Sequence, residues 1–388
     1  RDVMRPLVLD CETTFFDKGN PFDDRNKLCA IATYDVERGS KTVPIEYDGG
    51  PYKERLDEVR RVISNAELLI GFHIKFDLHW LSKYGIPLPD YCYDCQLGAF
   101  IISGQSRTFP SLNDIGESLN LGTKLDGGLS KYWDVGIDTP EIAWNEIEAY
   151  ANRDVELTWQ IYLKQQELLA SNHRLRTLVN LSCQDLLVLA DMEWNGLKFD
   201  LELAKQRQQE TQEKLDALTK ELNVLAGLPN FNWNSGHHIS SLLFGGSYIH
   251  QWKEQVGVYY TGIKQGEPRY RWLKKEYQLP RLVEPLKGTR LKDGVHYETN
   301  KNTLPNLPAT GRAKTIINLI LQYSELEKLQ STYYLGIPNL CNVFNWQDGI
   351  VHGSYNQVVA RTGRLSSSKP NLQNIAGAAD DLIVSRYC

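Results

Sequence analysis

Residues 5–14 read RPLVLDCETT, an apolar run that closes on two acids, Asp10 and Glu12. Its PLVLD core predicts a short buried strand. Two further acids, Asp77 in GFHIKFDLHW and Asp154 in YANRDVELTW, each follow a helix-like segment. Carboxylates supply the oxygen ligands that hard divalent cations prefer. Two such ions about 4 Å apart can hold the attacking water and the leaving oxygen of a phosphodiester. The pattern therefore indicates a metal-dependent phosphodiester hydrolase.

The composition is that of a folded chain with more than one domain. Its 388 residues predict two or three domains, and 41% hydrophobic residues are enough for proper cores. No apolar run reaches the roughly 18–20 residues needed to cross a bilayer, and no signal peptide is visible. The seven scattered cysteines predict a reducing compartment rather than a disulfide framework. We therefore expect a cytoplasmic protein.

Charge is distributed unevenly along the chain. The net charge is −5, but residues 1–170 carry 28 acids and 18 lysines and arginines, a net charge of −10. The remaining residues carry 20 acids and 25 lysines and arginines, a net charge of +5. The acidic half holds the candidate metal ligands, and the basic half is a plausible surface for phosphate contacts.

The first half alternates strand and helix patterns. Three runs near the start, PLVLD, LCAIATYDV and KTVPIEY, predict a meander, and LLIGF predicts another short strand. Helix-like stretches include YKERLDEVRRVISNA, FDLHWLSKYG and a long one from about Pro140 to Leu169. Mixed strands followed by helices favour an α/β fold.

The long helix places polar side chains in register. Glu146, Tyr150 and Asp154 are spaced by four residues and so share one helix face. In isolation this spacing is as typical of an exposed polar stripe as of a site. Together with the Asp10 and Glu12 pair and Asp77, in this order, it favours a site.

The pattern changes after residue 170. Long helices are predicted over 173–196, 201–227 and 312–334. Residues 245–310 show little periodicity, and within them bases alternate with aromatics, as in RYRW at 269–272. Such interleaving suits a loop that follows nucleic-acid phosphates. An ordinary solvated insertion is the alternative.

The segment VHGSYNQVVARTGRLSSSKPNLQNI (351–375) resembles a hallmark of family A DNA polymerases. Three upstream segments resemble the same family in the same order: MEWNGLKFD (192–200), FNWNSGHHISSLLF (231–244) and ILQYSELEKLQSTYY (320–334). The resemblance implies an α/β, ribonuclease H-like exonuclease domain over 1–170. A mainly α-helical thumb and the beginning of a polymerase palm would follow over 171–388.

The front half resembles the family's proofreading domain, a 3′-5′ exonuclease of the DEDDy class. Asp10 and Glu12 match its first motif, Asp77 its second, and Tyr150 with Asp154 its third. The resemblance implies that the four acids hold two Mg²⁺ ions, for which Mn²⁺ could substitute, with Asp77 acting through the outer shell. It implies that Tyr150 orients the attacking water.

The resemblance also implies nucleic-acid contacts in the second half. Their partners would be primer–template DNA and single-stranded 3′ ends. Arg364 would reach the minor groove near the primer terminus, where contacts check base-pair geometry without reading sequence. The other implied contacts are Asn371, Gln373, Asn374, Lys328, Ser331 and Thr332.

Three departures from the family pattern stand out. His73 takes the place of an asparagine in the second motif, and Ala376 that of a proline after NLQNI. The sequence ends at Cys388, before the motifs that carry the polymerase carboxylates. We therefore expect a palm and fingers polypeptide or region, and a processivity factor or other replication proteins, as partners. An intein beginning at Cys388 is one alternative to a simple boundary.

Three functions stay open. The first is the proofreading and primer–template-binding part of a replicative polymerase, expected to be phage-encoded and to act in the cytoplasm of the host. The second is a non-catalytic DNA-binding subunit of a split polymerase. The third is an exoribonuclease similar to RNase D, against which the TGRLSS segment argues.

Overall fold

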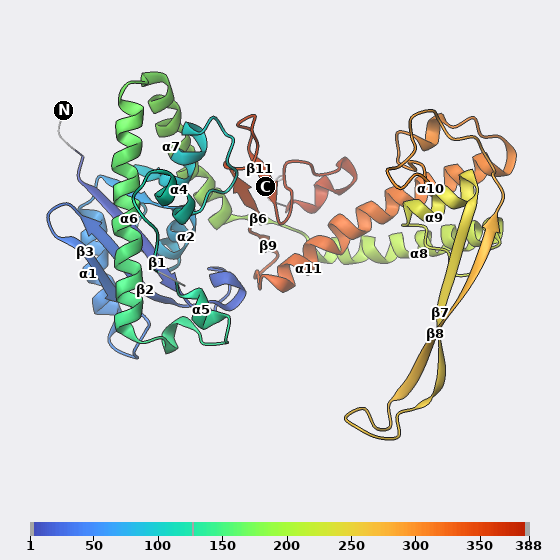
Figure 1. Cartoon of the computed structure of the whole chain (residues 1–388), viewed down its shortest axis with the longest axis horizontal. Helices are drawn as coiled ribbons and strands as arrows, with labels where there is room; N and C mark the ends of the chain where they lie inside the picture. The colour runs from blue at the N-terminus through green and yellow to red at the C-terminus, as the bar shows by residue number, and fades with distance from the viewer. Residues whose placement is uncertain (1–3, 126–127, 385–388) are drawn as a thin grey trace. The chain divides into compact units, whose positions relative to one another are not determined.

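The computed structural model describes residues 4–125 and 128–384, so Cys388 lies outside the described residues. The chain packs into two compact units. Unit 1 combines residues 1–200 with 339–388, and unit 2 comprises 201–338; Figure 1 labels their elements. Because this division follows packing, the functional division at residue 170 stays a prediction. No helix in the described ranges combines the length and the apolarity that crossing a bilayer requires.

Unit 1 is built on a five-stranded mixed sheet in the order β3-β2-β1-β4-β5. The first three strands form the antiparallel meander that the sequence predicts, and β4 and β5 continue the sheet in parallel beyond β1. β1 is thus central, and its Leu7, Val8 and Leu9 are buried. The strands are β1 (Pro6–Thr13), β2 (Leu28–Asp35), β3 (Gly39–Pro44), β4 (Leu68–Gly71) and β5 (Cys92–Asp94).

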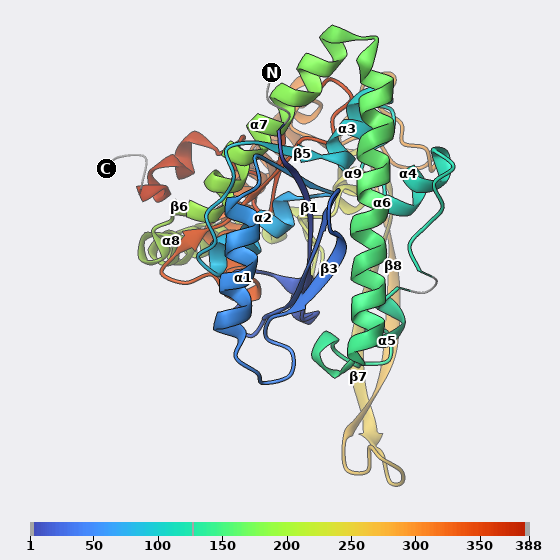
Figure 2. The ribbon, with the colours of Figure 1, turned by 90° about the vertical axis from the view of Figure 1, so that its left-hand side faces the viewer.

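Helices cover both faces of this sheet (Figure 2). α6 (Trp144–Ala170) packs along β1, β2 and β3 through a buried stripe that includes Ile147, Ala151 and Val155. α1 (Tyr52–Ser64) lies on the opposite side. The other helices before residue 200 are η1 (Phe16–Gly19), α2 (Lys75–Lys83), α3 (Cys95–Ile102), α4 (Leu112–Ser118), α5 (Ser130–Trp133), η2 (Thr139–Glu141) and α7 (His173–Asn195).

The last part of the chain returns to unit 1 through short strand pairs. One short strand pair joins residues 197–198 to 350–351, and a second lies within 354–368. The elements are β6 (Leu197–Lys198), α11 (Gly336–Val343), β9 (Ile350–Val351), β10 (Ser354–Asn356), β11 (Ser366–Ser368) and η5 (Gly377–Leu382).

One buried carboxylate, Glu193 of α7, connects these returning strands to the rest of unit 1. Its Oε1 accepts hydrogen bonds from Lys75 Nζ of α2 at 2.6 Å and from the backbone N–H of Tyr355 in β10 at 2.6 Å. His79 Nε2, one helical turn after Lys75, lies 3.2 Å from Oε2. Burial opposes the charge, but His79 and Lys75 outweigh it and lower the pKa of Glu193. A single charged group therefore holds α2, α7 and β10 together.

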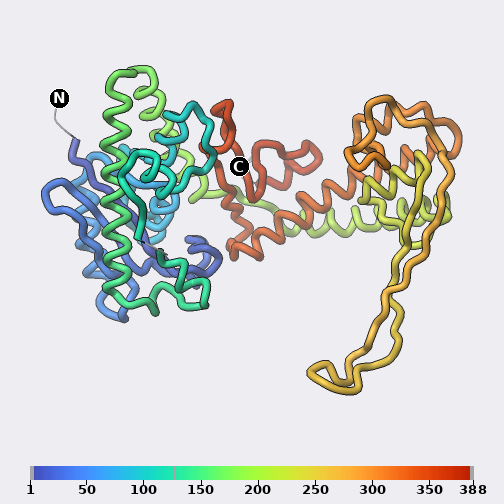
Figure 3. The backbone as a smooth tube through the Cα atoms, viewed as in Figure 1, coloured from blue at the N-terminus to red at the C-terminus, as the bar shows by residue number. Residues whose placement is uncertain are grey.

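Unit 2 is built on two long helices that lie side by side, α8 (Leu201–Ala226) and α10 (Gly311–Leu329), as Figure 3 shows. The π-helical turn η4 (Gln330–Tyr334) continues α10, so the predicted helix over 312–334 is confirmed. α9 (Gly236–Phe244) packs its apolar side chains into the same core. A short turn, η3 (Leu304–Asn306), precedes α10.

The absence of regular structure predicted over 245–310 is wrong for the first part of that range. β7 (Gly246–Val258) and β8 (Pro268–Leu279) pair into a long antiparallel hairpin (Figure 1). Aromatic side chains occur on both faces of these strands, for example Tyr248, which is buried, and Trp272, which is exposed. The alternation in RYRW (269–272) is therefore interrupted at Leu273, where the apolar residues change to the other face, so no continuous strand pattern runs through the segment.

We predict that Glu193→Ala destabilises unit 1 by about 3–5 kcal/mol, because it leaves the largely buried Lys75 without its carboxylate. The measurement is the midpoint of denaturant unfolding at pH 7. Glu37→Ala, which removes an exposed carboxylate from the same unit, is the control and should change the midpoint little. Equal midpoints for the two variants would contradict a structural role for Glu193.

Candidate metal-dependent active site

The centre of the site is the C-terminal half of β1. Asp10 and Glu12 are two residues apart on this strand, so their side chains leave the same face of the sheet. The strand is hydrogen-bonded to β2 through this stretch, with Asp10 opposite Ala32 and Glu12 opposite Ala30. The small side chains of these alanines leave room above the sheet for the two carboxylates.

α6 brings the third acid onto this face. Asp154 lies in the middle of the helix and is 3% exposed, and Glu12 is 6% exposed. The ligand oxygens of Asp10, Glu12 and Asp154 all lie within 4.8 Å of one another. Three carboxylates that are distant in sequence thus converge in a largely buried position.

Crowding and burial change the protonation of these acids. Burial, followed by the charge of Asp154, raises the pKa of Asp10 to about 7. Burial and the charge of Asp10 likewise raise the pKa of Glu12 well above its usual value. Without a cation the three groups cannot all be charged at low cost, so the arrangement favours binding of positive charge.

Asp77 lies in the first turn of α2 and contacts β1 between the two acids. Its Oδ1 accepts a hydrogen bond from the backbone N–H of Cys11 at 2.8 Å, and it is 2% exposed. Burial and the charge of Asp10 raise its pKa. Asp77 therefore fixes the strand between the two acids, and its expected outer-shell contribution to a metal stays a prediction.

Tyr150 lies one helical turn before Asp154 and shares a cation with it. Lys124 Nζ donates hydrogen bonds to Tyr150 Oη at 2.8 Å and to Asp154 Oδ2. Burial, followed by the charge of Asp154, raises the pKa of Tyr150, so the phenol is neutral at physiological pH. Glu146, on the same face, accepts from Tyr132 instead and takes no part in the cluster.

Lys124 is the residue of this site that the sequence does not reveal. It lies in the segment between α4 and α5, in LGTKLDGG (121–128), where neither periodicity nor a motif distinguishes it. Burial opposes its charge, but Asp154, Tyr150 and Asp10 outweigh burial and raise its pKa. Lys124 therefore supplies one permanent positive charge to a group of acids.

The residues present fit a hard divalent cation. The donor set consists of carboxylate oxygens alone, which is the preference of Mg²⁺ and Mn²⁺. Asp154 Oδ1 is buried and has no hydrogen-bond partner in the part of the chain that the structure describes. A buried carboxylate oxygen without a donor is costly, and coordination to a cation would satisfy it.

His73 does not face this cluster. Its backbone N–H donates to Asp94 Oδ1 at 3.0 Å, and its ring Nδ1 lies 3.1 Å from Gln96 Oε1. The backbone of His73 is left-handed, with a φ of 59°. The residue thus connects the start of α2 to the start of α3, and no contact with the acids of β1 is found among the described residues.

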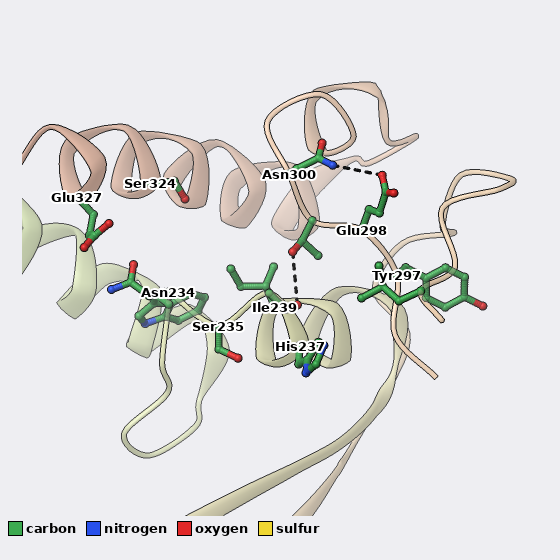
Figure 4. A pocket seen from close by; sticks show the side chains of 13 residues that line it. Asn234, Ser235, His237, Ile239, Tyr297, Glu298, Asn300, Ser324 and Glu327 are labelled. Carbon is green, nitrogen blue, oxygen red and sulfur yellow. Dashed lines mark hydrogen bonds between the residues drawn. The ribbon is translucent and has the colours of Figure 1, made fainter. Parts of the chain in front are cut away.

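A second group of possible metal ligands lies in unit 2. His237, Asp293 and His296 have ligand atoms within 4.8 Å, beside the pocket that Figure 4 shows. The two imidazoles are stacked, with centroids 4.4 Å apart and planes 11° apart, so their in-plane lone pairs do not converge. Asp293 Oδ2 already lies 2.7 Å from His296 Nδ1. In the pocket itself, Glu298 accepts a hydrogen bond from the side chain of Asn300. Because these groups already have partners and the imidazoles do not converge, we place the metal chemistry at β1.

The nucleic-acid contacts implied by the sequence all lie at the surface. Those in unit 1 occur in the loops around β11, where the Asn371 side chain accepts from the backbone N–H of Gln373 at 3.1 Å. Those in unit 2 occur at the end of α10 and in η4. Their contact with DNA stays a prediction; the exposed residues are Lys328, Ser331, Thr332, Arg364, Asn371, Gln373 and Asn374.

The comparisons with known proteins identify the domains of this chain. Residues 3–170 match the family model "3'-5' exonuclease", and residues 270–383 match "DNA polymerase family A". The DNA polymerase I of Pseudomonas aeruginosa is 26% identical over 384 residues, and that of Borreliella burgdorferi is 26% identical over 382. Both alignments cover 95% of this chain.

A solved structure has the same fold. The POL domain of Pol1 from M. smegmatis, in complex with DNA primer-template and dNTP, superposes with a TM-score of 0.67 at 18% identity, over 97% of this chain and 53% of that one. The chain spans about a third of the length of the bacterial relatives it matches, 36% and 35% for the two named above. The chain belongs to family A of the DNA polymerases, with a 3′-5′ exonuclease domain followed by the early polymerase region.

We predict that, without divalent ions, the protonation of Asp10 contributes to the unfolding free energy of unit 1, and that this contribution is lost as the pH rises from about 4 to about 7. The folded state holds the Asp10 proton up to a pKa of about 7, whereas the usual value is 3.8, so deprotonation over this range costs stability. Asp10→Asn should reduce this pH dependence, although Glu12 and Asp77 retain part of it. Thermal melts in EDTA across this pH range measure it, and parallel curves for both proteins would contradict the assigned protonation of Asp10.

Proposed function

We propose that unit 1 removes nucleotides from the 3′ end of DNA by metal-dependent hydrolysis of the terminal phosphodiester. The observation that carries this proposal is the convergence of Asp10, Glu12 and Asp154 on one buried position. In this proposal residues 1–170 form the proofreading domain, and residues 171–388 form the beginning of the polymerase region, which binds primer–template DNA. The named relatives are bacterial, so an origin in a phage and action in the cytoplasm of its host stay predictions.

Asp10, Glu12 and Asp154 would hold two Mg²⁺ ions. When bound, such ions lower the pKa of a coordinated water and offset the negative charge that develops on the phosphate oxygens. Asp77 would keep Asp10 and Glu12 in place through the backbone N–H of Cys11. The chain's part is therefore to concentrate negative charge where the cations bind and to exclude bulk water from it.

Tyr150 would position the attacking water. Lys124 donates to the phenol oxygen, so the phenol's own hydrogen can be donated to Asp154 or to an oxygen of the substrate or water. Because the phenol is neutral, it can orient a water or a phosphate oxygen but is a poor general base. Lys124 would act as a positioning residue that holds both Tyr150 and Asp154 at the cluster.

The substrate would be a frayed or single-stranded 3′ end. A mismatched terminal pair costs less to unpair than a matched one, so it reaches such a site more often. Arg364 and the 371–374 segment would contact the duplex near the primer terminus, and Lys328, Ser331 and Thr332 its phosphates. Minor-groove acceptors are shared among base pairs, so these contacts would test geometry and not sequence.

We predict that Asp10→Ala with Glu12→Ala abolishes Mg²⁺-dependent degradation of a labelled single-stranded DNA while the protein stays folded. The double variant should also lose Mn²⁺ binding in calorimetry, because two of the three converging carboxylates are gone. Glu37→Ala with Glu54→Ala, which removes two exposed acids from the same unit, is the matched control and should retain both properties. Retained nuclease activity in the first variant would refute the site, and degradation of RNA in preference to DNA would favour an exoribonuclease.

We predict that Tyr150→Phe lowers the turnover rate roughly 10- to 1000-fold with little change in DNA affinity, since positioning and acid–base groups contribute on this scale. Tyr162→Phe is the control, because Tyr162 lies on the same helix but packs against Tyr93 and Trp159. Single-turnover rates and binding titrations separate the two effects. If Tyr150→Phe turns over like the unchanged protein, Tyr150 only packs.

A further inference from the structure

The hairpin of unit 2 offers an exposed surface that the proposed exonuclease does not use. β7 and β8 pair without another strand, in a two-stranded sheet, and extend from the body of their unit (Figure 1). The register sets Lys253 opposite Trp272 and Gln255 opposite Tyr270. Residues opposite one another in an antiparallel pair share a face, and faces alternate along each strand.

The two faces of the hairpin have different roles. On one face Tyr248 is buried and Trp252, Leu273 and Tyr277 are half-buried, and Tyr248 and Tyr277 join the core of unit 2. This face anchors the hairpin. Packing therefore explains the aromatic residues on this face of the hairpin.

The other face has no such explanation. Tyr270 and Trp272 are 52% and 64% exposed and lie two residues apart on β8, about 6.8 Å along the strand. Lys253 Nζ lies 5.0 Å from the centre of the Trp272 ring, and Lys274 follows on the same face. We call these four residues, Lys253, Tyr270, Trp272 and Lys274, the hairpin platform.

Positive charge predominates around the platform. Residues 246–279 contain six lysines and arginines and three acids, a net charge of +3 in a chain whose total is −5. Each of the six is exposed, and within the described residues none has a carboxylate partner within 4.0 Å. Unpaired cations beside exposed aromatic rings complement a strand of phosphates and free bases.

A single strand fits this surface better than a duplex or a protein. The bases of a duplex are stacked inside it, whereas those of a single strand can stack on aromatic side chains, and every base has a flat face to do so. The exposed apolar side chains on this face of the strands include Ile249 besides Tyr270 and Trp272, and lysines separate them. A partner protein would need a larger continuous apolar patch. Because the chain belongs to a DNA polymerase family, we take the single strand to be DNA.

We propose that the hairpin platform binds single-stranded DNA, with bases against Tyr270 and Trp272 and phosphates beside Lys253 and Lys274. This goes beyond the proposed hydrolysis and does not depend on it, because strand binding needs neither the metal ions nor the acids of β1. Its failure and that of the nuclease are therefore separate results.

The test is the fluorescence anisotropy of a labelled oligo(dT) titrated with the full chain in EDTA. Tyr270→Ala with Trp272→Ala should weaken binding by roughly 5-fold or more for each ring removed, the scale of base–aromatic stacking. Lys253→Gln with Lys274→Gln should lower the slope of log affinity against log salt by about 1.4, since each phosphate contact on a single strand contributes about 0.7. Circular dichroism checks that each variant is folded.

The matched control is Arg271→Gln with Lys275→Gln, which removes the same charge from the opposite face of the same hairpin. A much smaller loss in this variant than in the lysine variant supports the platform. Equal losses of affinity in the two charge variants would mean that binding depends only on general electrostatic attraction, and would overturn the proposal. Unchanged oligo(dT) affinity in the aromatic variant, or an equal loss for a blunt duplex of the same length, would overturn it as well.

Discussion

Repulsion among like charges on β1 is the constraint around which unit 1 is organised. Asp10 and Glu12 leave the same face of a central strand, and α6 adds Asp154 within 4.8 Å. Burial strengthens the repulsion, as the raised pKa values of Asp10 and Glu12 show. Lys124 offsets part of it from a loop, and the rest favours cations. The carboxylates whose burial destabilises the fold are thus the ones that make the site selective for hard divalent cations.

A second charged group serves structure instead. Glu193 belongs to the MEWNGLKFD segment, whose resemblance to the family points to the start of the polymerase region. In the structure it accepts from Lys75 and from the backbone of Tyr355, 162 residues further on. Glu193 lies at a domain boundary in the family pattern, but in the folded chain it connects α2 to β10. Packing, accordingly, places residues 171–200 and 339–388 with the exonuclease fold.

The two units use charged residues in different ways. In unit 1 the acids are buried and converge, so their effect depends on distances within a few ångströms. On the hairpin the cations are exposed and spaced along two strands, which suits a flexible polymer that can adjust to them. Trp272 and Tyr248 lie on the same hairpin, yet one is exposed and the other is buried in the core. Composition alone cannot separate these roles, because the face of each strand decides them.

Local patterns in the sequence were enough to predict several elements. The apolar run of β1, the four-residue spacing of Tyr150 and Asp154 on α6, and the TGRLSS segment are all contiguous, so periodicity and motif were sufficient to predict them. Which distant groups meet became known from the folded structure. Lys124 donates a hydrogen bond to Asp154, 30 residues further along the chain. β7 pairs with β8 although the alternation in β8 changes phase at Leu273. The reason is physical: a residue's neighbours along the chain set its backbone preference, whereas burial and charge depend on neighbours that only folding supplies.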